Sequence, residues 1–107
     1  MKATINIANF SVYPGGRDDD DGPYNGTRFR TEFLLPAFQK NTPIIVNFDG
    51  TRGYGSSFLE EAFGGLIRRC GYTKKQVLEL IEFKSSRESI LRETMKYIDA
   101  AEQESKQ

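Results

Sequence analysis

The sequence predicts a small α/β domain: a sandwich with a mostly parallel β-sheet, built in the order strand, helix, strand, helix, strand, helix. Three observations predict it: the alternation of residues 3–12, the apolar run of residues 44–48, and helical apolar spacing in the segments that follow each strand. Strands that alternate with helices form parallel sheets through right-handed crossovers. With 107 residues, the whole chain (1–107) is expected to form one domain.

The first part of the chain reads as strand, loop and helix. Residues 3–12 alternate apolar and polar side chains, with a slip in phase at Ala8-Asn9 that suits a β-bulge, so we expect a half-exposed strand. Residues 13–26 hold two prolines, four glycines and four successive aspartates, which predicts a long loop that is either disordered or functional. Thr27 can cap a helix to about Asn41, with a kink or a new turn at Pro36.

The middle of the chain contains the strand expected to be central in the sheet. Ile44 to Phe48 are mostly apolar, as is typical of a strand buried on both faces. The next helix is predicted from about Phe58 to Arg69, opened by a capping box of Ser57 and Glu60. Gly64 and Gly65 inside this helix cost helix propensity, so another backbone should pack closely there.

The last part of the chain supplies the third strand and the last helix. A short capped turn over residues 73–76 should lead into a strand over residues 77–83. A second capping box, Ser85 with Glu88, opens a final amphipathic helix. Its end is expected to fray from about Gln103.

Composition excludes several functional classes. Lys plus Arg equals Asp plus Glu, 15 against 15, so no bulk attraction to nucleic acid or to an anionic membrane is expected. No histidine is present and Cys70 is the single cysteine, which excludes Ser-His and Cys-His nucleophiles, His-bearing zinc sets and an internal disulfide. We therefore expect a protein that is not an enzyme and needs no cofactor. With no apolar leader and no membrane-spanning stretch, it should be cytoplasmic.

The loop after the central strand is the predicted functional region, because ligands and partners of α/β domains meet the carboxyl ends of strands and the amino ends of helices. Arg52, with the backbone N–H groups of Gly53 and Gly55, could hold an anion, although a plain tight turn explains the same residues. Tyr54 is expected to be exposed at the loop tip, where it could anchor a partner.

Two serines and two glutamates mark the start of the next helix. Helix capping explains Ser57, whereas Ser56 is expected to be accessible, either as part of the cap or as a regulated hydroxyl. Glu60 and Glu61 are adjacent and point about 100° apart, so they cannot form a paired acid and base. Glu60 is the expected cap partner, and Glu61 an exposed or partner-facing charge.

The run of four aspartates does not predict a metal site. Aligning Gly22 with the invariant glycine of a calcium loop puts arginines, Arg17 and Arg28, at the first and the bidentate ligand positions, so an EF-hand is excluded. A solvated acidic loop is the favoured interpretation. Arg28 and Arg30 do not share a helix face, so we expect them to pair with the aspartates at the surface rather than to form one anion clamp.

The segments Asn47-Phe48-Asp49-Gly50, Ser56 to Gly64, Gly22 to Arg30 and Leu34-Leu35-Pro36-Ala37 resemble the STAS-like domain family of unknown function DUF4325 over residues 14–70. The arrangement is more distantly similar to STAS domains of anti-sigma factor antagonists. In those, a serine at this helix start is phosphorylated by a kinase-like anti-sigma factor. The resemblance places Ser56 at the corresponding position, although Gly55 precedes the serine pair and Phe58 follows it, where those antagonists have Asp and Gly.

These observations lead to one functional expectation and one alternative. The first is a non-enzymatic regulatory module that docks a protein partner, which the resemblance implies could be a kinase-like ATPase, through residues 52–61 with Ser56 as a switch. The alternative is a sensor of a nucleotide or another anion at the same loop. Homo-oligomerisation also stays open, because an edge strand over residues 3–12 could pair with a second copy.

Overall fold

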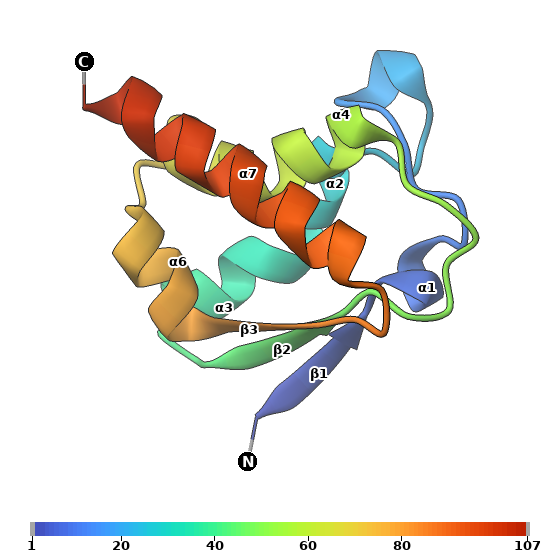
Figure 1. Ribbon diagram of the computed structural model, residues 1–107, viewed down its shortest axis with the longest axis horizontal. Helices are drawn as coiled ribbons and strands as arrows, with labels where there is room; N and C mark the ends of the chain where they lie inside the picture. The colour runs from blue at the N-terminus through green and yellow to red at the C-terminus, as the bar shows by residue number, and fades with distance from the viewer. Residues whose placement is uncertain (1, 107) are drawn as a thin grey trace.

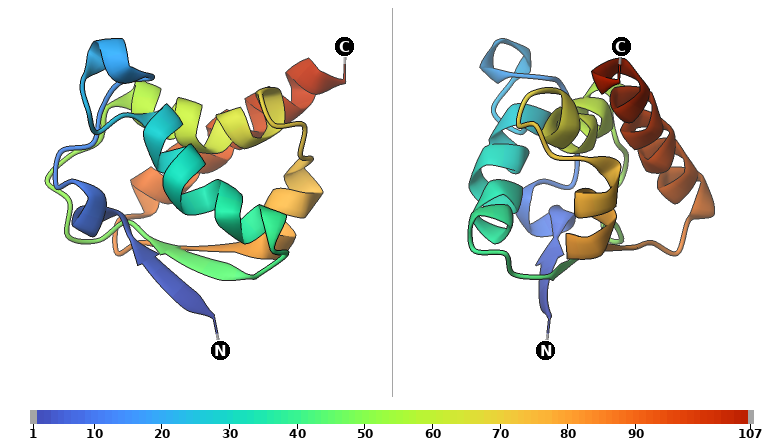
Figure 2. Two further views of the ribbon diagram at one scale, coloured as in Figure 1. Left: turned by 180° about the vertical axis from the view of Figure 1, so that it is seen from behind. Right: turned by 90° about the vertical axis from the view of Figure 1, so that its left-hand side faces the viewer.

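The computed structural model describes residues 2–106 and confirms the α/β class (Figure 1). Three parallel strands, β1 (Ala3–Asn6), β2 (Ile44–Asn47) and β3 (Ile81–Lys84), form a sheet in the order β1-β2-β3. The apolar strand β2 is therefore central, as predicted. The helices gather over one face of this sheet, which gives the molecule two layers (Figures 1 and 2).

The helical segments of residues 2–106 are α1 (Ile7–Phe10), η1 (Asp19–Asp21), α2 (Gly26–Phe29), η2 (Arg30–Leu34), α3 (Leu35–Gln39), α4 (Ser56–Leu59), η3 (Glu60–Gly64), α5 (Gly65–Arg68), α6 (Lys74–Leu80) and α7 (Glu88–Ser105). Of these, η1 is a 3₁₀ turn, and η2 and η3 are π-helical turns. None of the described helices is long and apolar enough to cross a bilayer.

The register of the sheet separates an apolar face from a polar one. Ile5, Val46 and Phe83 are register partners and lie under the helices, where Val46 is fully buried. On the opposite face, the neighbouring positions carry mainly polar side chains, and the Asn47 amide donates to Asn6 Oδ1 at 3.0 Å. The alternation of strand side chains thus makes the sheet one-sided, with its core face toward the helices.

The first strand is shorter than predicted. It ends at Asn6, and residues 7–10 form α1 instead of continuing through a bulge to residue 12. Ile7 and Phe10 lie three residues apart and are both buried, a spacing that a helical turn satisfies and an extended strand does not. The slip in phase at Ala8-Asn9 therefore marks this turn.

The third strand is also shorter than predicted. Residues 74–80 form helix α6, and only residues 81–84 pair with β2. The capped turn at residues 73–76 is confirmed as a full capping box, in which the Gln76 N–H donates to Thr73 Oγ1 at 3.2 Å. Val77 and Leu80, three residues apart, are both buried, which again is helical spacing.

The helical stretches of residues 26–39 and 56–68 each contain a π turn. Helix α2 begins after Asn25, whose side chain accepts from the Arg28 N–H at 2.8 Å, so Asn25 caps the helix and the predicted Thr27 does not. A π turn then leads into α3, where the Leu35 N–H donates to the Arg30 carbonyl one residue before Pro36. Pro36 has no N–H to donate, so the irregular turn beside it is where this helix departs from α geometry.

Two predicted capping boxes are absent. The Ser57 and Glu60 side chains form no capping box, because α4 starts after Gly55 without a side-chain cap. The Ser85 and Glu88 box is also absent: α7 starts after Arg87, and Ser85 Oγ accepts from the Arg87 N–H at 3.0 Å. At its other end, α7 continues to Ser105, beyond the expected fraying point at Gln103.

The close approach between helix α2 and the helical stretch of residues 56–68 needs glycine. A Cβ on Gly26 would lie 2.7 Å from the Phe58 carbonyl oxygen and 2.9 Å from the Ala62 nitrogen, both of them backbone atoms. The expectation of a close backbone at Gly64 is confirmed, since a Cβ there would lie 3.4 Å from the Tyr97 carbonyl oxygen on α7. At Gly65 the close neighbour is instead the Arg30 side chain.

Candidate functional site

The segments that follow all three strands meet at the carboxyl edge of the sheet (Figure 1). The loop after β2 is hydrogen-bonded to the segment after α1, because the Arg52 N–H donates to the Val12 carbonyl at 2.7 Å and the Gly55 N–H to the Pro14 carbonyl at 3.2 Å. On its other side, Asp49 Oδ1 accepts from the Ser86 N–H at 2.8 Å and from its hydroxyl at 2.9 Å. The loop is therefore held by both neighbours.

The hydrogen bonds of Asp49 keep its carboxylate ionised. The N–H of Ser86 is the main cause that lowers the pKa of Asp49, followed by the Ser86 hydroxyl, with Lys84 and Arg87 contributing through their charge. An ionised Asp49 thus connects the end of β2 to the turn between β3 and α7. This connection shapes the edge on which the predicted site lies.

The predicted anion site at the loop keeps only part of its donors. The backbone N–H groups of Arg52 and Gly55 are already donated to the segment after α1, which leaves the Gly53 N–H and the Arg52 guanidinium. The guanidinium lies over the Tyr13 ring, 5.9 Å from its centroid, and Nη1 is 3.4 Å from the Tyr13 hydroxyl. Arg52 is exposed, and the side chain of Tyr13 is 62% exposed.

Tyr54 is not the exposed loop tip that the sequence suggested. Its hydroxyl donates to the Phe48 carbonyl at 2.7 Å, and its ring packs against Phe48 and Phe58 at centroid distances of 5.7 and 6.1 Å. Burial raises the pKa of Tyr54 to about 12. The exposed tyrosine of this edge is instead Tyr13, in the loop that follows α1.

The two serines lie at the start of α4. Ser56 is the first residue of the helix and is exposed, whereas Ser57 is half-buried. The Ser56 hydroxyl lies beside the Tyr97 phenol on α7. Burial and the hydrogen bond to Glu93 raise the pKa of Tyr97, and Ser56 acts against them. Neither serine caps the helix, so the hydroxyl of Ser56 is accessible and is not needed for the cap.

Glu61 is buried, which corrects the prediction of an exposed or partner-facing charge. Its side chain is 2% exposed and accepts from Arg30 Nη1 at 3.0 Å and from Arg69 Nε. Burial raises the pKa of Glu61, but the hydrogen bonds from Arg69 and Arg30 outweigh it and hold the pKa below its ordinary value. Arg30 is itself only 5% exposed and does not pair with the aspartates.

Glu60 is part of the same ion-pair cluster but lies nearer the surface. It pairs with Arg17 and Arg68, and Arg17 Nη1 also lies 3.6 Å from Glu61 Oε1. The pairing of Arg17 ties the start of the acidic segment to η3. Both glutamates therefore hold helices and loops together, and Glu60 is not the predicted cap partner.

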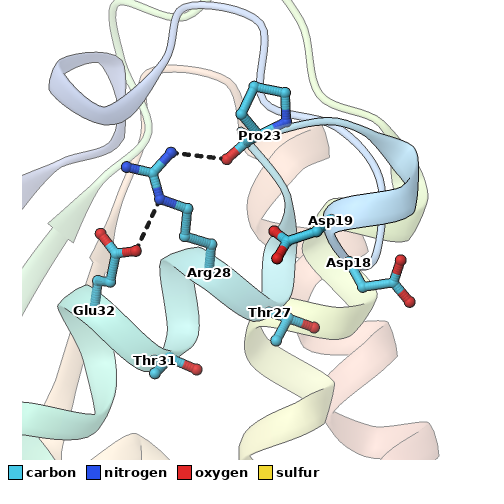
Figure 3. A pocket seen from close by; sticks show the side chains of 7 residues that line it. All are labelled: Asp18, Asp19, Pro23, Thr27, Arg28, Thr31 and Glu32. Atoms are coloured by element: carbon cyan, nitrogen blue, oxygen red, sulfur yellow. Dashed lines mark hydrogen bonds and ion pairs between the residues drawn. The ribbon is translucent and has the colours of Figure 1, made fainter.

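The aspartate run is exposed, and it is ordered by its own hydrogen bonds. Asp18 Oδ1 accepts from the Asp20 N–H at 3.1 Å, and Asp21 Oδ2 accepts from the Arg17 N–H at 2.9 Å. Between this segment and α2 lies a cavity of about 480 Å³, in which Arg28 bonds to Glu32 and to the Pro23 carbonyl (Figure 3). In residues 2–106, no three His, Cys, Asp or Glu side chains are grouped to hold a metal ion.

The family model described as a STAS-like domain of unknown function, DUF4325, matches residues 25–91. The chain belongs to this family. Neither the curated proteins nor the solved structures gave a significant match. The match of this DUF4325 domain runs from the cap of α2 into the first turn of α7, so it includes the loop after β2 and both glutamates. Strand β1, Tyr13 and Arg17 lie outside the matched residues.

Sequence reasoning missed the ion pair of Arg30 and Glu61 in this DUF4325 domain, although a signal was present. Glu61 stands among the apolar rows of a helix that is buried on most of its circumference, and a charge in such a place requires a partner. Gly65, one turn further along the same helix, leaves the space that the Arg30 side chain occupies. Glutamate on a buried helix, together with an arginine on the facing helix, was the pattern that could have revealed the pair.

Proposed function

We propose that this DUF4325 domain is a non-enzymatic regulatory module that docks a protein partner at the carboxyl edge of its sheet, through the loop Arg52–Gly55 and the start of α4. Docking is reversible, and modification of Ser56 controls it. The supporting observation is the position of Ser56: an exposed hydroxyl at the first residue of a buried helix, with no role in the helix cap.

The surroundings of Ser56 favour an added negative charge. The amino end of a helix carries unpaired N–H groups and partial positive charge, which stabilise a phosphate. Glu60 and Glu61 would repel such a group, but each of them is paired with arginines, so their charge is largely compensated. A phosphate on Ser56 therefore changes the charge and shape of the docking surface without removing a core contact.

The experiment is affinity purification of the tagged protein from its native host as wild type, Ser56→Asp and Ser56→Ala, with mass spectrometry of what co-purifies. We expect a partner that wild type and Ser56→Ala retain and Ser56→Asp loses. Ser89→Asp is the matched control, because Ser89 is also an exposed serine in the first turn of a helix, on α7. Equal retention by all four forms would refute the switch at Ser56.

The alternative, a sensor of a nucleotide or another anion, retains fewer donors, because two loop N–H groups are engaged. Calorimetry with ATP and with inorganic phosphate tests it directly. Saturable binding that Arg52→Ala abolishes, combined with no partner in the purification, would favour the sensor over the docking module.

A further inference from the structure

The carboxyl edge of the sheet carries cations that form no ion pair within residues 2–106. Six arginines form ion pairs within residues 2–106: Arg17, Arg28, Arg30, Arg68, Arg69 and Arg92. The two that form none there are Arg52 and Arg87, on the loops that follow β2 and β3. Lys84, the last residue of β3, is likewise without an ion pair in the described residues. All three side chains are exposed.

One carboxylate, that of Asp49, lies beside two of these cations. Asp49 lies close enough to Lys84 and Arg87 for their charges to lower its pKa, but its Oδ1 is already occupied by Ser86. The chain as a whole is balanced, 15 basic against 15 acidic residues. An excess of positive charge at one edge of a neutral protein is therefore local, and it attracts negative groups to that edge.

Apolar contact area adjoins one of these cations, Arg52. Tyr13 is 62% exposed and carries Arg52 over its ring, and Val12 beside it is 42% exposed. Tyrosine and arginine are the residue types that dominate binding energy in protein interfaces, because they combine large area with polar groups. A stacked tyrosine and arginine pair that has no carboxylate partner among the described residues is thus suited to intermolecular contact.

We propose that this edge receives an acidic segment of a protein partner, with Asp or Glu side chains at Arg52, Lys84 and Arg87 and an apolar side chain against Tyr13 and Val12. The inference rests on the proposed docking function and names the chemistry of the partner. A peptide fits better than a compact phosphate, because the cations are spread over two loops and the loop N–H groups of Arg52 and Gly55 are already donated.

The experiment selects short random displayed peptides on three immobilised proteins: wild type, the charge-reversed double variant Arg52→Glu with Arg87→Glu, and Lys40→Glu with Lys96→Glu. Lys40 and Lys96 are exposed cations without ion pairs in residues 2–106, on α3's carboxyl end and on α7, so the control carries the same charge change elsewhere. Circular dichroism first verifies that the variants keep the fold.

Wild type and the control variant should enrich peptides in which Asp or Glu flank an aromatic or aliphatic residue. A selected peptide should lose at least about tenfold in affinity for the Arg52→Glu, Arg87→Glu variant and weaken as salt is raised. The inference is overturned if no acidic peptides are enriched, if the variant enriches them equally, or if inorganic phosphate alone binds with saturation at these residues.

The two proposals fail separately. A native partner that Ser56→Asp releases but that Arg52→Glu with Arg87→Glu retains would leave the docking module in place and overturn the acidic segment. Enriched acidic peptides whose affinity does not respond to Ser56→Asp would support the acidic surface and count against Ser56 as its switch.

Discussion

Replacing Glu61 by glutamine should destabilise the protein far more than the same change one residue earlier. Glu61→Gln keeps the size of the side chain and removes its charge. Arg30, which is 5% exposed, then stays charged in the interior with its Nη1 bonded only to neutral groups. Its Nε already has no hydrogen-bond partner in residues 2–106. The change therefore isolates the cost of a buried, uncompensated guanidinium.

The expected loss follows from the burial of the pair. Removing one partner of a buried ion pair costs about 3–5 kcal/mol, and glutamine can still accept one hydrogen bond from Arg30, which favours about 3 kcal/mol. In a domain of this size that lowers the melting temperature by roughly 12–24 °C. Glu60→Gln should cost about 1 kcal/mol or less, because Arg17 and Arg68, the partners of Glu60, are 49% and 31% exposed.

Urea unfolding of both variants, followed by circular dichroism, measures the two losses. The double variant Arg30→Met with Glu61→Leu should recover much of the stability lost in Glu61→Gln, because it removes both charges together. If Glu61→Gln loses no more free energy of unfolding than Glu60→Gln does, the buried Arg30 does not depend on the charge of Glu61.

The pH dependence of the free energy of unfolding tests the buried Glu61 carboxylate independently. The folded pKa of Glu61 lies below its ordinary value of 4.5, so the carboxylate is favoured in the folded state. Its contribution is complete above about pH 4.5 and is lost as pH falls through the lower folded pKa. Wild type should therefore lose stability more steeply than Glu61→Gln in this acidic range.

Three further contacts can be tested by substitution. Gly26→Ala should cost about 1–3 kcal/mol, because its Cβ meets the backbone of the facing helix, while Gly53→Ala, with open space around it, should stay within about 0.5 kcal/mol; equal losses would contradict the close crossing. Thr73→Ala should cost about 1 kcal/mol and Ser57→Ala within about 0.5, since only the threonine caps a helix; the reverse order would restore the predicted cap. Tyr54→Phe should cost about 1 kcal/mol, because it removes the hydrogen bond to the Phe48 carbonyl, and it should remove the phenol absorbance step near pH 12. In wild type, the stability contributed by the protonated phenol of Tyr54 should decline as pH rises from 10 to about 12. An absorbance titration that is the same in the variant and in wild type would argue against burial of Tyr54.

Parts of the fold were predictable because they depend on local pattern. The apolar run of β2 predicted a central strand, and Thr73 with Gln76 predicted a capped turn, since both signals lie within a few residues. The helix α6 was missed because residues 77–83 form one mostly apolar run whose length also suits a strand. The buried pair Val77 and Leu80 is helical, and only Ile81 and Phe83 alternate as a strand requires.

The candidate site was less predictable, because exposure there depends on contacts between distant residues. Tyr54 stands in a glycine-rich loop, which suggested an exposed tip, but the loop folds back so that its hydroxyl reaches the Phe48 carbonyl. The accessibility of Ser56 was predicted, but the helix begins at Ser56 and not at about Phe58. The exposed cations at the edge could not be predicted, since whether Arg52 or Arg30 has a carboxylate partner is decided only when the helices are assembled.

The two π turns bear on which changes in length the chain can tolerate. A π turn contains one residue more than an α turn and takes that residue up within a single wider turn, so the helix beyond it keeps nearly the phase of an uninterrupted α-helix. Deleting a single residue from η3 should therefore restore α geometry and leave Arg68, Arg69 and Leu66 close to their present faces. A single-residue change in the α-helical turns would instead rotate everything beyond it by about 100°. Among members of the family, single-residue differences in length within these helices should therefore fall at η2 and η3, and longer ones in the loops around residues 13–24 and 50–55.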